Sequence, residues 1–142
     1  MATPATATAP MSAGTRRGRR ALGVVGATLA TLPVWFVGEP ILGHDLKFDQ
    51  PGHPTTDLDG FAFMLFAAVS SLLGWALLAV LERVVPARAA QIWTITALVV
   101  LVLSFLPSLA ITATAGTKAV LIVAHIAVAA VLIPVFRTTT RR

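Results

Sequence analysis

The chain has 142 residues, of which 56% are apolar and only 12% are charged, against roughly 25% charged residues in a typical soluble domain. Its formal net charge is +5, and it contains neither cysteine nor tyrosine. This composition excludes disulfides, thiolate nucleophiles, cysteine-based zinc or iron–sulfur sites, and a phenolic acid or base.

Four stretches of the chain contain no Asp, Glu, Lys or Arg: Ala21–Gly38, Gly60–Leu81, Ala89–Thr117 and Ala119–Phe136. Each is about long enough to cross a bilayer as a helix, which takes roughly 20 apolar residues. A chain of this length could not bury four such segments in water, because a small domain exposes a large fraction of its surface. The sequence therefore predicts an all-α fold, an integral membrane four-helix bundle.

The first twenty residues, 1–20, are predicted to form a disordered basic arm. Their first part is mostly Ala, Thr and Pro without a periodic apolar pattern, so burial could not offset the entropy lost on ordering. Directly before the first apolar stretch lie four arginines, Arg16, Arg17, Arg19 and Arg20. A cleavable signal peptide over residues 16–35 is disfavoured, because its apolar run exceeds the usual core of roughly 7–15 residues and no clear A-x-A site follows.

One membrane domain is expected over residues 21–137, followed by a short basic tail, 138–142. Its helices are predicted at about 21–37, 61–81, 91–111 and 119–136. The loop between the first two, residues 39–59, contains five of the six acidic residues. Asp57 or Asp59 is expected to cap the second helix, where a negative charge suits the helix dipole. Gly116 is expected to stop the third helix.

The distribution of basic residues predicts the orientation of the bundle. Nine of the eleven Lys and Arg residues lie in the N-terminal arm, the second loop or the segment after the fourth helix, which begins at Arg137. Only Lys47 and Lys118 lie in the other two loops. Because cytoplasmic segments are enriched in Lys and Arg, we expect both termini in the cytoplasm.

The arginine cluster Arg16, Arg17, Arg19 and Arg20 has two interpretations. It determines the topology of the first span, and it is also expected to contact anionic lipid, worth about 1 kcal/mol for each basic residue near the surface. Elsewhere the pairs Gly26/Ala30 and Ser70/Gly74 have the spacing of small residues that lets helices approach closely.

His125 is the one ionisable residue well inside a predicted span. Intramembrane ionisable groups are candidates for a functional site, as a relay, a ligand or a hydrogen-bond donor. The favoured interpretation is structural: a neutral imidazole bonded to a facing helix, at Ser70, Ser104 or Ser108.

Pro107 interrupts the third span and removes one backbone donor, so a kink is expected there. Ser104 and Ser108 lie beside it and are expected to satisfy the freed backbone groups. A static kink is favoured over a hinge or a broken-helix binding site, since no second broken helix with a polar lining is apparent.

The loop also contains His44, Asp45, Asp49 and His53, which are ligand-type side chains. Their spacing matches no tight metal motif, so a solvated acidic loop is favoured over a zinc or copper site.

The sequence contains no GxSxG, HExxH, P-loop or GxGxxG motif in a suitable context. We therefore expect that the protein is not an enzyme and that it binds no cofactor. We also expect no catalytic, cofactor-binding or metal-ligating residues. His125, Pro107 and Ser104 remain as functional candidates.

Two segments carry a resemblance to a known family: RAAQIWTITALVVLVLSFLPSL (Arg88–Leu109) and AHIAVAAVLIPVFRTT (Ala124–Thr139). On these, the chain resembles a family of small four-span membrane proteins of unknown function from high-GC Gram-positive bacteria. The resemblance implies a four-helix membrane fold and a plasma-membrane location, and it transfers no activity or site residue.

The leading functional interpretation is a non-enzymatic integral membrane protein that serves as an accessory or scaffold subunit. The alternative is a small transporter or channel that works as a homo-oligomer. The expected partners are the lipid bilayer and either a second copy of the chain or another membrane protein, and not nucleic acid.

Overall fold

The computed structural model describes residues 11–49, 52 and 54–140, and within them it is almost entirely helical. Four helical segments are long and apolar enough to cross a membrane: Ala13–Ile41, Gly60–Val84, Pro86–Ala110 and Ala115–Thr139. The expected all-α fold with four apolar helices is therefore confirmed. Residues 1–10 of the predicted disordered arm lie outside the described residues.

The first span begins earlier than the sequence indicated. Helix α1 covers Ala13–Leu29, and its N-terminus is capped by Ser12, whose hydroxyl accepts a hydrogen bond from the Thr15 N–H at 3.2 Å. Residues 13–20 were predicted to belong to the disordered arm, and this boundary is wrong. The Ser12 cap satisfies a free amide of the first turn, and the Arg20 side chain is buried, so both ends of this segment are held.

Two prolines divide the remainder of this span. Pro33 has no N–H to donate to Leu29, and α1 gives way at Ala30 to helix α2, Thr31–Phe36. Pro40 lies in a π-helical turn, η1, which covers Val37–Ile41. There the Leu42 N–H donates to the Val37 carbonyl at 2.9 Å, five residues earlier. This π-helical bond replaces the α-helical pattern around Pro40, which has no N–H.

The other spans are α3 (Gly60–Val84), α4 (Ala89–Ala110) and α5 (Ala115–Thr139), with a short 3-10 turn η2, Pro86–Arg88, before α4. The predicted cap of α3 is confirmed at Asp59, whose carboxylate accepts from the Ala62 N–H at 2.7 Å. The predicted role of Gly116 is wrong. Helix α4 ends at Ala110, and Gly116 lies in the first turn of α5, behind the Thr114 cap.

The acidic loop between α2 and α3 contains a small antiparallel hairpin. Strand β1 is Lys47–Phe48 and strand β2 is Thr56–Asp57, with Lys47 opposite Asp57. On either side of it Leu46 and Leu58 are buried against Phe63, Val120 and Ala124. The hairpin therefore rests on the ends of α3 and α5 through apolar side chains, although its acidic side chains face outward.

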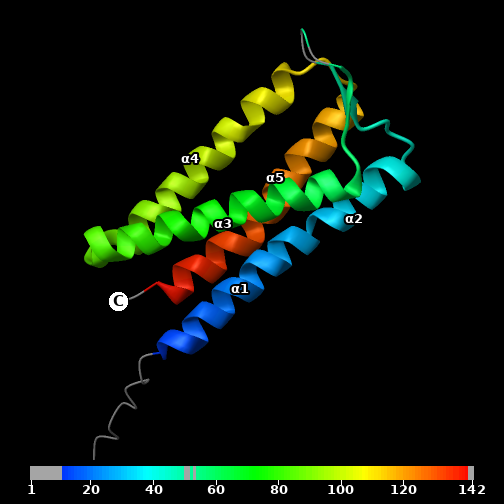
Figure 1. The fold of residues 1–142 in the computed structure, drawn as a ribbon. Coiled ribbons are helices and arrows are strands. Elements are labelled where there is room, and N and C mark those ends of the chain that lie inside the picture. The colour runs from blue at the N-terminus through cyan, green and yellow to red at the C-terminus, as the bar shows by residue number, and fades with distance from the viewer. Residues whose placement is uncertain (1–10, 50–51, 53, 141–142) are drawn as a thin grey trace, which may run out of the picture.

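Two further contacts fix the hairpin region, one to the turn between α4 and α5 and one to the first turn of α5. The Asp49 N–H donates to the Thr112 carbonyl at 3.3 Å, and the Thr117 hydroxyl donates to the Asp45 carbonyl at 3.0 Å. We call this end of the bundle the hairpin end, and the opposite end, which holds the start of α1 and the end of α5, the termini end (Figure 1).

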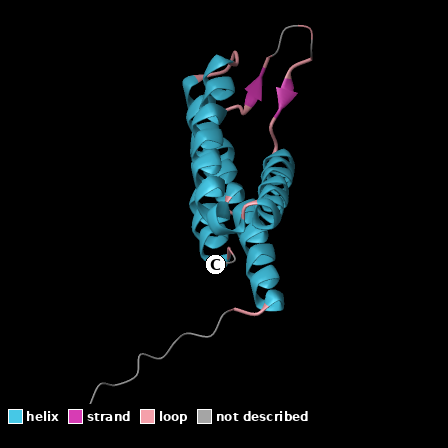
Figure 2. Cartoon of the chain, turned by 90° about the vertical axis from the view of Figure 1, so that its left-hand side faces the viewer, coloured by secondary structure: helices cyan, strands magenta, loops and turns pink. Residues whose placement is uncertain are grey.

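The helices are not equally packed. Helices α1, α3 and α5 share a core of Val24, Ala27, Leu78, Leu132 and Phe136, and Trp93 of α4 joins this core near the termini end. From the turn that joins them, α3 and α4 diverge toward the hairpin end in both views (Figures 1 and 2). Only 11% of the α4 span is buried, less than in any other of the four spans.

Three glycines, Gly23, Gly26 and Gly74, lie at contacts between helices. A Cβ atom built on Gly23 would lie 2.7 Å from Cγ1 of Val135, and one on Gly26 would lie 3.5 Å from Val131. Gly74 packs on the ring of Trp93. Helix α1 therefore touches α5, and α3 touches α4, where glycine lets the backbones approach.

One buried guanidinium joins three helices at the termini end. Both terminal nitrogens of Arg20 (α1) donate to the carboxylate of Glu82 (α3), at 3.0 and 2.7 Å. Its Nε donates to the Thr139 hydroxyl at 3.1 Å, and Nη2 also donates to the Thr139 carbonyl at 2.7 Å, at the end of α5. The side chains of Arg20 and Glu82 are 4% and 7% exposed. This arrangement is bidentate and charge-assisted, and Thr139 satisfies further donors of Arg20.

We predict that Glu82→Ala lowers the free energy of unfolding by roughly 3–5 kcal/mol, because it leaves a buried guanidinium without its counter-charge. Unfolding of the purified protein in mixed detergent micelles measures the change. Arg19→Ala, at an exposed position one residue from Arg20, is the matched control and should change stability by less than about 0.5 kcal/mol. If Glu82→Ala were as stable as the unsubstituted protein, the ion pair would not stabilise the fold.

A second substitution tests the contact between α1 and α5. Gly23→Leu is expected to cost about 1–3 kcal/mol of stability, because its side chain would overlap Val135. Gly18→Leu lies in the same helix with nothing within 4 Å of its Cβ position, so it should be neutral or slightly stabilising. The same unfolding assay distinguishes the two, and a neutral Gly23→Leu would contradict the close approach.

Candidate functional site

A cavity of about 750 Å³ lies between α3, α4 and α5. This volume is within the range of roughly 300–1,000 Å³ that is typical of ligand pockets. Phe66, Leu73 and Val100 line it and remain exposed, so the cavity opens sideways between α3 and α4. A second hollow, over α1 and α5, measures about 240 Å³ and is smaller than that range.

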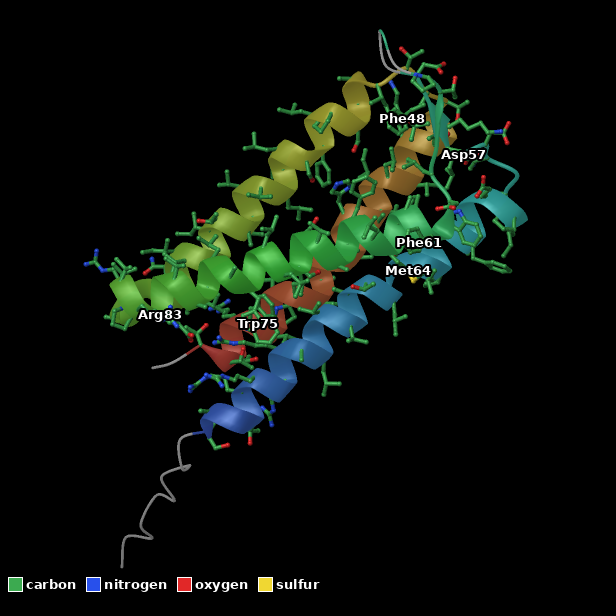
Figure 3. The ribbon with its side chains drawn as sticks, viewed as in Figure 1. Phe48, Asp57, Phe61, Met64, Trp75 and Arg83 are labelled. Carbon is green, nitrogen blue, oxygen red and sulfur yellow. The ribbon has the colours of Figure 1, made fainter. Side chains whose placement is uncertain are left out.

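The cavity is closed toward the termini end. There the Trp93 Nε1–H donates to the Gly74 carbonyl at 2.8 Å, which ties α4 to α3. The Trp93 ring also packs on Phe136, with ring centroids 5.1 Å apart. At the opposite end, Phe48 of strand β1 contributes to the lining, and Figure 3 shows Phe48 near the end of α4, far from Arg83.

The cavity brings together the polar residues that the sequence analysis singled out. His125, Ser104, Pro107, Ser70 and Ser108 all contribute to its lining. They come from three helices, because α3, α4 and α5 each turn one face toward the same space. The sequence candidates thus share one site, although they do not bond to one another across it in the predicted way.

The predicted hydrogen bond of His125 to a facing helix is wrong. Its Nδ1 lies 2.7 Å from the carbonyl oxygen of Leu121, one turn earlier in α5. A carbonyl can only accept, so Nδ1 carries the proton, and in a neutral imidazole Nε2 is then an acceptor.

The serines beside Pro107 also bond within their own helix. The Ser104 hydroxyl donates to the Leu101 carbonyl at 2.6 Å, and the Ser108 hydroxyl donates to the Ser104 carbonyl at 3.1 Å. Pro107 leaves the Leu103 carbonyl without its usual helical donor, and these two hydroxyls bond elsewhere. The expectation that they satisfy the freed group is therefore not met, and α4 nevertheless continues through Pro107 to Ala110.

The metal-type residues of the loop do not converge where the structure describes them. Among residues 11–49, 52 and 54–140, no three His, Cys, Asp or Glu side chains are arranged to hold a metal ion. His44 instead packs against Gly116 at the start of α5, and the Asp49 carboxylate accepts a bond from the Thr55 hydroxyl at 2.6 Å. His53 lies outside the described residues.

The four arginines before the first span do not share one environment. Arg20 is buried in the ion pair with Glu82, whereas Arg17 and Arg19 are exposed and Arg16 is half-buried. Arg20 is therefore occupied within the protein, and any contact with anionic lipid falls to Arg16, Arg17 and Arg19.

The sequence did not point to three residues of this arrangement. Glu82 follows an apolar span directly, and its sequence position alone gives no sign of the pairing with Arg20. Trp93 and Thr96 were not singled out, yet with Ala97, Val100 and Ser104 they follow a helical spacing that predicts one face of α4.

A family profile described as a family of unknown function (DUF6069) matches residues 11–142. No curated protein and no solved structure matches the chain.

The bond of His125 predicts its tautomer. In the neutral imidazole we expect Nδ1 to be protonated and Nε2 to be unprotonated, because the Leu121 carbonyl accepts from Nδ1. Nitrogen-15 NMR of labelled protein in micelles measures this, and His125→Phe assigns the signal among the three histidines. A proton on Nε2 in the neutral ring would contradict the arrangement.

Proposed function

The chain belongs to the family of unknown function DUF6069, and from its structure we propose that it is a non-enzymatic, multi-pass plasma-membrane protein that serves as an accessory or scaffold subunit. One observation carries the proposal: the cavity that His125 and Pro107 line does not continue through the bundle. The packed core around Trp93, Leu78 and Phe136 fills the space between the cavity and the termini end. A single copy thus offers a lateral binding surface rather than a path for a solute.

The described part of the hairpin supports this function. Its acidic side chains point outward, while Leu46 and Leu58 hold it against the ends of α3 and α5. A fixed polar surface suits the recognition of a partner, because little further ordering would be needed on binding.

The exposed faces of α3 and α4 provide the membrane-embedded part of such an interface. Val102 is 62% exposed and Leu106 is 60% exposed, on the span that has the smallest buried share of the four. The absence of catalytic motifs from the sequence supports a function without catalysis.

The proposed location and orientation follow from charge. The termini end carries most of the Lys and Arg residues and the hairpin end most of the acidic ones, so we place both termini in the cytoplasm. The resemblance carried by Arg88–Leu109 and Ala124–Thr139 supports the same location, because it indicates a family of four-span plasma-membrane proteins from high-GC Gram-positive bacteria.

The second candidate function is a small homo-oligomeric transporter or channel. It is favoured by one observation, that Pro107 and His125 line the same cavity. A second copy placed against α4 would be needed to complete a path, since the single bundle is closed toward the termini end.

Photo-crosslinking in native membranes distinguishes the two functions. A photoreactive amino acid at Val102, on the exposed face of α4, should join the chain to one other polypeptide in a fixed ratio. The matched control is Leu22, which is 71% exposed on α1, and it should give no such product. Crosslinking at Val102 to a second copy of the chain, together with solute flux in proteoliposomes of the purified protein, would refute the accessory function and support transport.

The orientation has its own test. Because the chain lacks cysteine, a single introduced thiol is the only site for a maleimide. We expect an impermeant maleimide to label Thr56→Cys, in strand β2, on intact cells. Thr138→Cys, at the end of α5, should react only after the cells are permeabilised. The reverse pattern would place the termini outside.

A further inference from the structure

We propose that the cavity between α3, α4 and α5 binds a neutral amphiphile: a long-chain molecule whose polar group donates a hydrogen bond, such as an alcohol. The inference goes beyond an accessory function, and it rests on the proposed placement of the four helices in a bilayer. Two features of the lining carry it, namely the hydrogen-bonding character of its polar groups and their depth.

Four polar side chains in the lining already donate a hydrogen bond to a backbone carbonyl of their own helix. Ser70 donates to the Phe66 carbonyl at 2.6 Å, Ser104 to that of Leu101, and Ser108 to that of Ser104. His125 donates through Nδ1 to Leu121. What these groups still offer to the cavity is oxygen lone pairs and the Nε2 lone pair, all of them acceptors. A ligand that donates a hydrogen bond satisfies them.

The position of these acceptors separates a polar part of the cavity from an apolar part. Ser70 and His125 each lie ten residues from the hairpin end of their helices, about 15 Å along the axis at 1.5 Å per residue. Ser104 lies six residues from the end of α4, about 9 Å. Further toward the termini end the lining is apolar apart from the hydroxyl of Thr96, with Leu77, Ala97 and Leu132. A chain with its polar end toward the hairpin end therefore places its tail against apolar side chains.

The charge of the lining selects a neutral ligand. None of the lining residues is Asp, Glu, Lys or Arg, so an ionised group at this depth would lack a counter-charge within the cavity. A carboxylate or a phosphate would also face four acceptors. A ketone or an ether, which only accept, would leave Nε2 of His125 unpaired, and the preferred polar group is a hydroxyl or a neutral amide.

The shape of the opening indicates how such a molecule enters. Phe66 and Leu73 on α3 and Val100 on α4 are 64%, 65% and 57% exposed and stand at the rim. The opening lies between two helices of a proposed bilayer protein, so the ligand enters sideways from the lipid phase. Trp93, bonded to Gly74, limits how far its tail can reach.

The test uses the whole protein in nanodiscs of a phosphatidylcholine bilayer. The probe is a long-chain primary alcohol with a diazirine in its chain, and the control probe is its methyl ether, which lacks only the donor. Mass spectrometry of the labelled peptides measures binding. We expect the alcohol to label the cavity-lining peptides of α3, α4 and α5 about fivefold more than the ether, the difference that one hydrogen bond makes.

Two pairs of variants locate the site. His125→Phe removes the Nε2 acceptor and should reduce the preference for the alcohol to none, whereas Ile126→Phe, outside the lining, should keep it. Val100→Trp fills the opening and should reduce labelling by both probes. Val99→Trp, next to it and outside the lining, should not. If His125→Phe does not fold, Ser104→Ala replaces it and should lower the preference.

Equal labelling of the cavity by the alcohol and the ether, or a preference that survives His125→Phe, would overturn the proposed ligand class. Labelling by neither probe would overturn the cavity as a site for a small ligand. It would then favour a helix of a partner or of a second copy as the occupant of the cavity. A failure of the underlying placement is recognised separately, because the protein would then not incorporate into the nanodisc.

Discussion

The guanidinium of Arg20 is the polar contact on which the arrangement of the bundle depends. Between apolar helices in a bilayer there is no hydrophobic driving force, so packing and polar bonds decide which helices stay together. Arg20 bonds to Glu82 and Thr139 and so joins α1, α3 and α5. Helix α4 takes no part in these bonds, and its tie to α3 is the Trp93–Gly74 bond near the same end. The result is a bundle that is tight at the termini end and open between α3 and α4 beyond it.

The hairpin end is stabilised differently. Leu46 and Leu58 bury apolar surface against the ends of α3 and α5. The Asp49 N–H bonds to the turn after α4, and the Thr117 hydroxyl of α5 bonds to the Asp45 carbonyl of the loop. The described residues of the acidic loop therefore form a cap on the bundle, because apolar residues alternate with the charges. Between the two ends lies a laterally open cavity, in which three serines and His125 are left as acceptors because each already donates to its own helix.

The sequence alone was sufficient for the coarse fold and insufficient for the site. Runs without charge predict four helices because hydrocarbon excludes ionised groups, and the structure has these helices. The start at Ala13 was missed since the Ser12 cap and the burial of Arg20 outweigh a composition that favours disorder. The structure places His125, Ser104 and Pro107 in the lining of one cavity, a proximity that the sequence did not predict. Their bonds were not predictable, because a serine or histidine in a helix chooses between its own backbone and a neighbouring helix, and that choice depends on how far α4 diverges. The pairing of Arg20 with Glu82 joins residues 62 positions apart, which local pattern cannot show.

The divergence of α4 from α3 is the central claim, and distances between spin labels in nanodiscs test it most directly. The cysteine-free chain accepts two pairs of labels at exposed positions, Leu65 with Leu109 toward the hairpin end and Val80 with Ile95 toward the termini end. The structure predicts a clearly longer distance for Leu65–Leu109 than for Val80–Ile95. Equal distances for the two pairs would mean that α3 and α4 pack along their whole length, and the cavity with its proposed ligand would not exist.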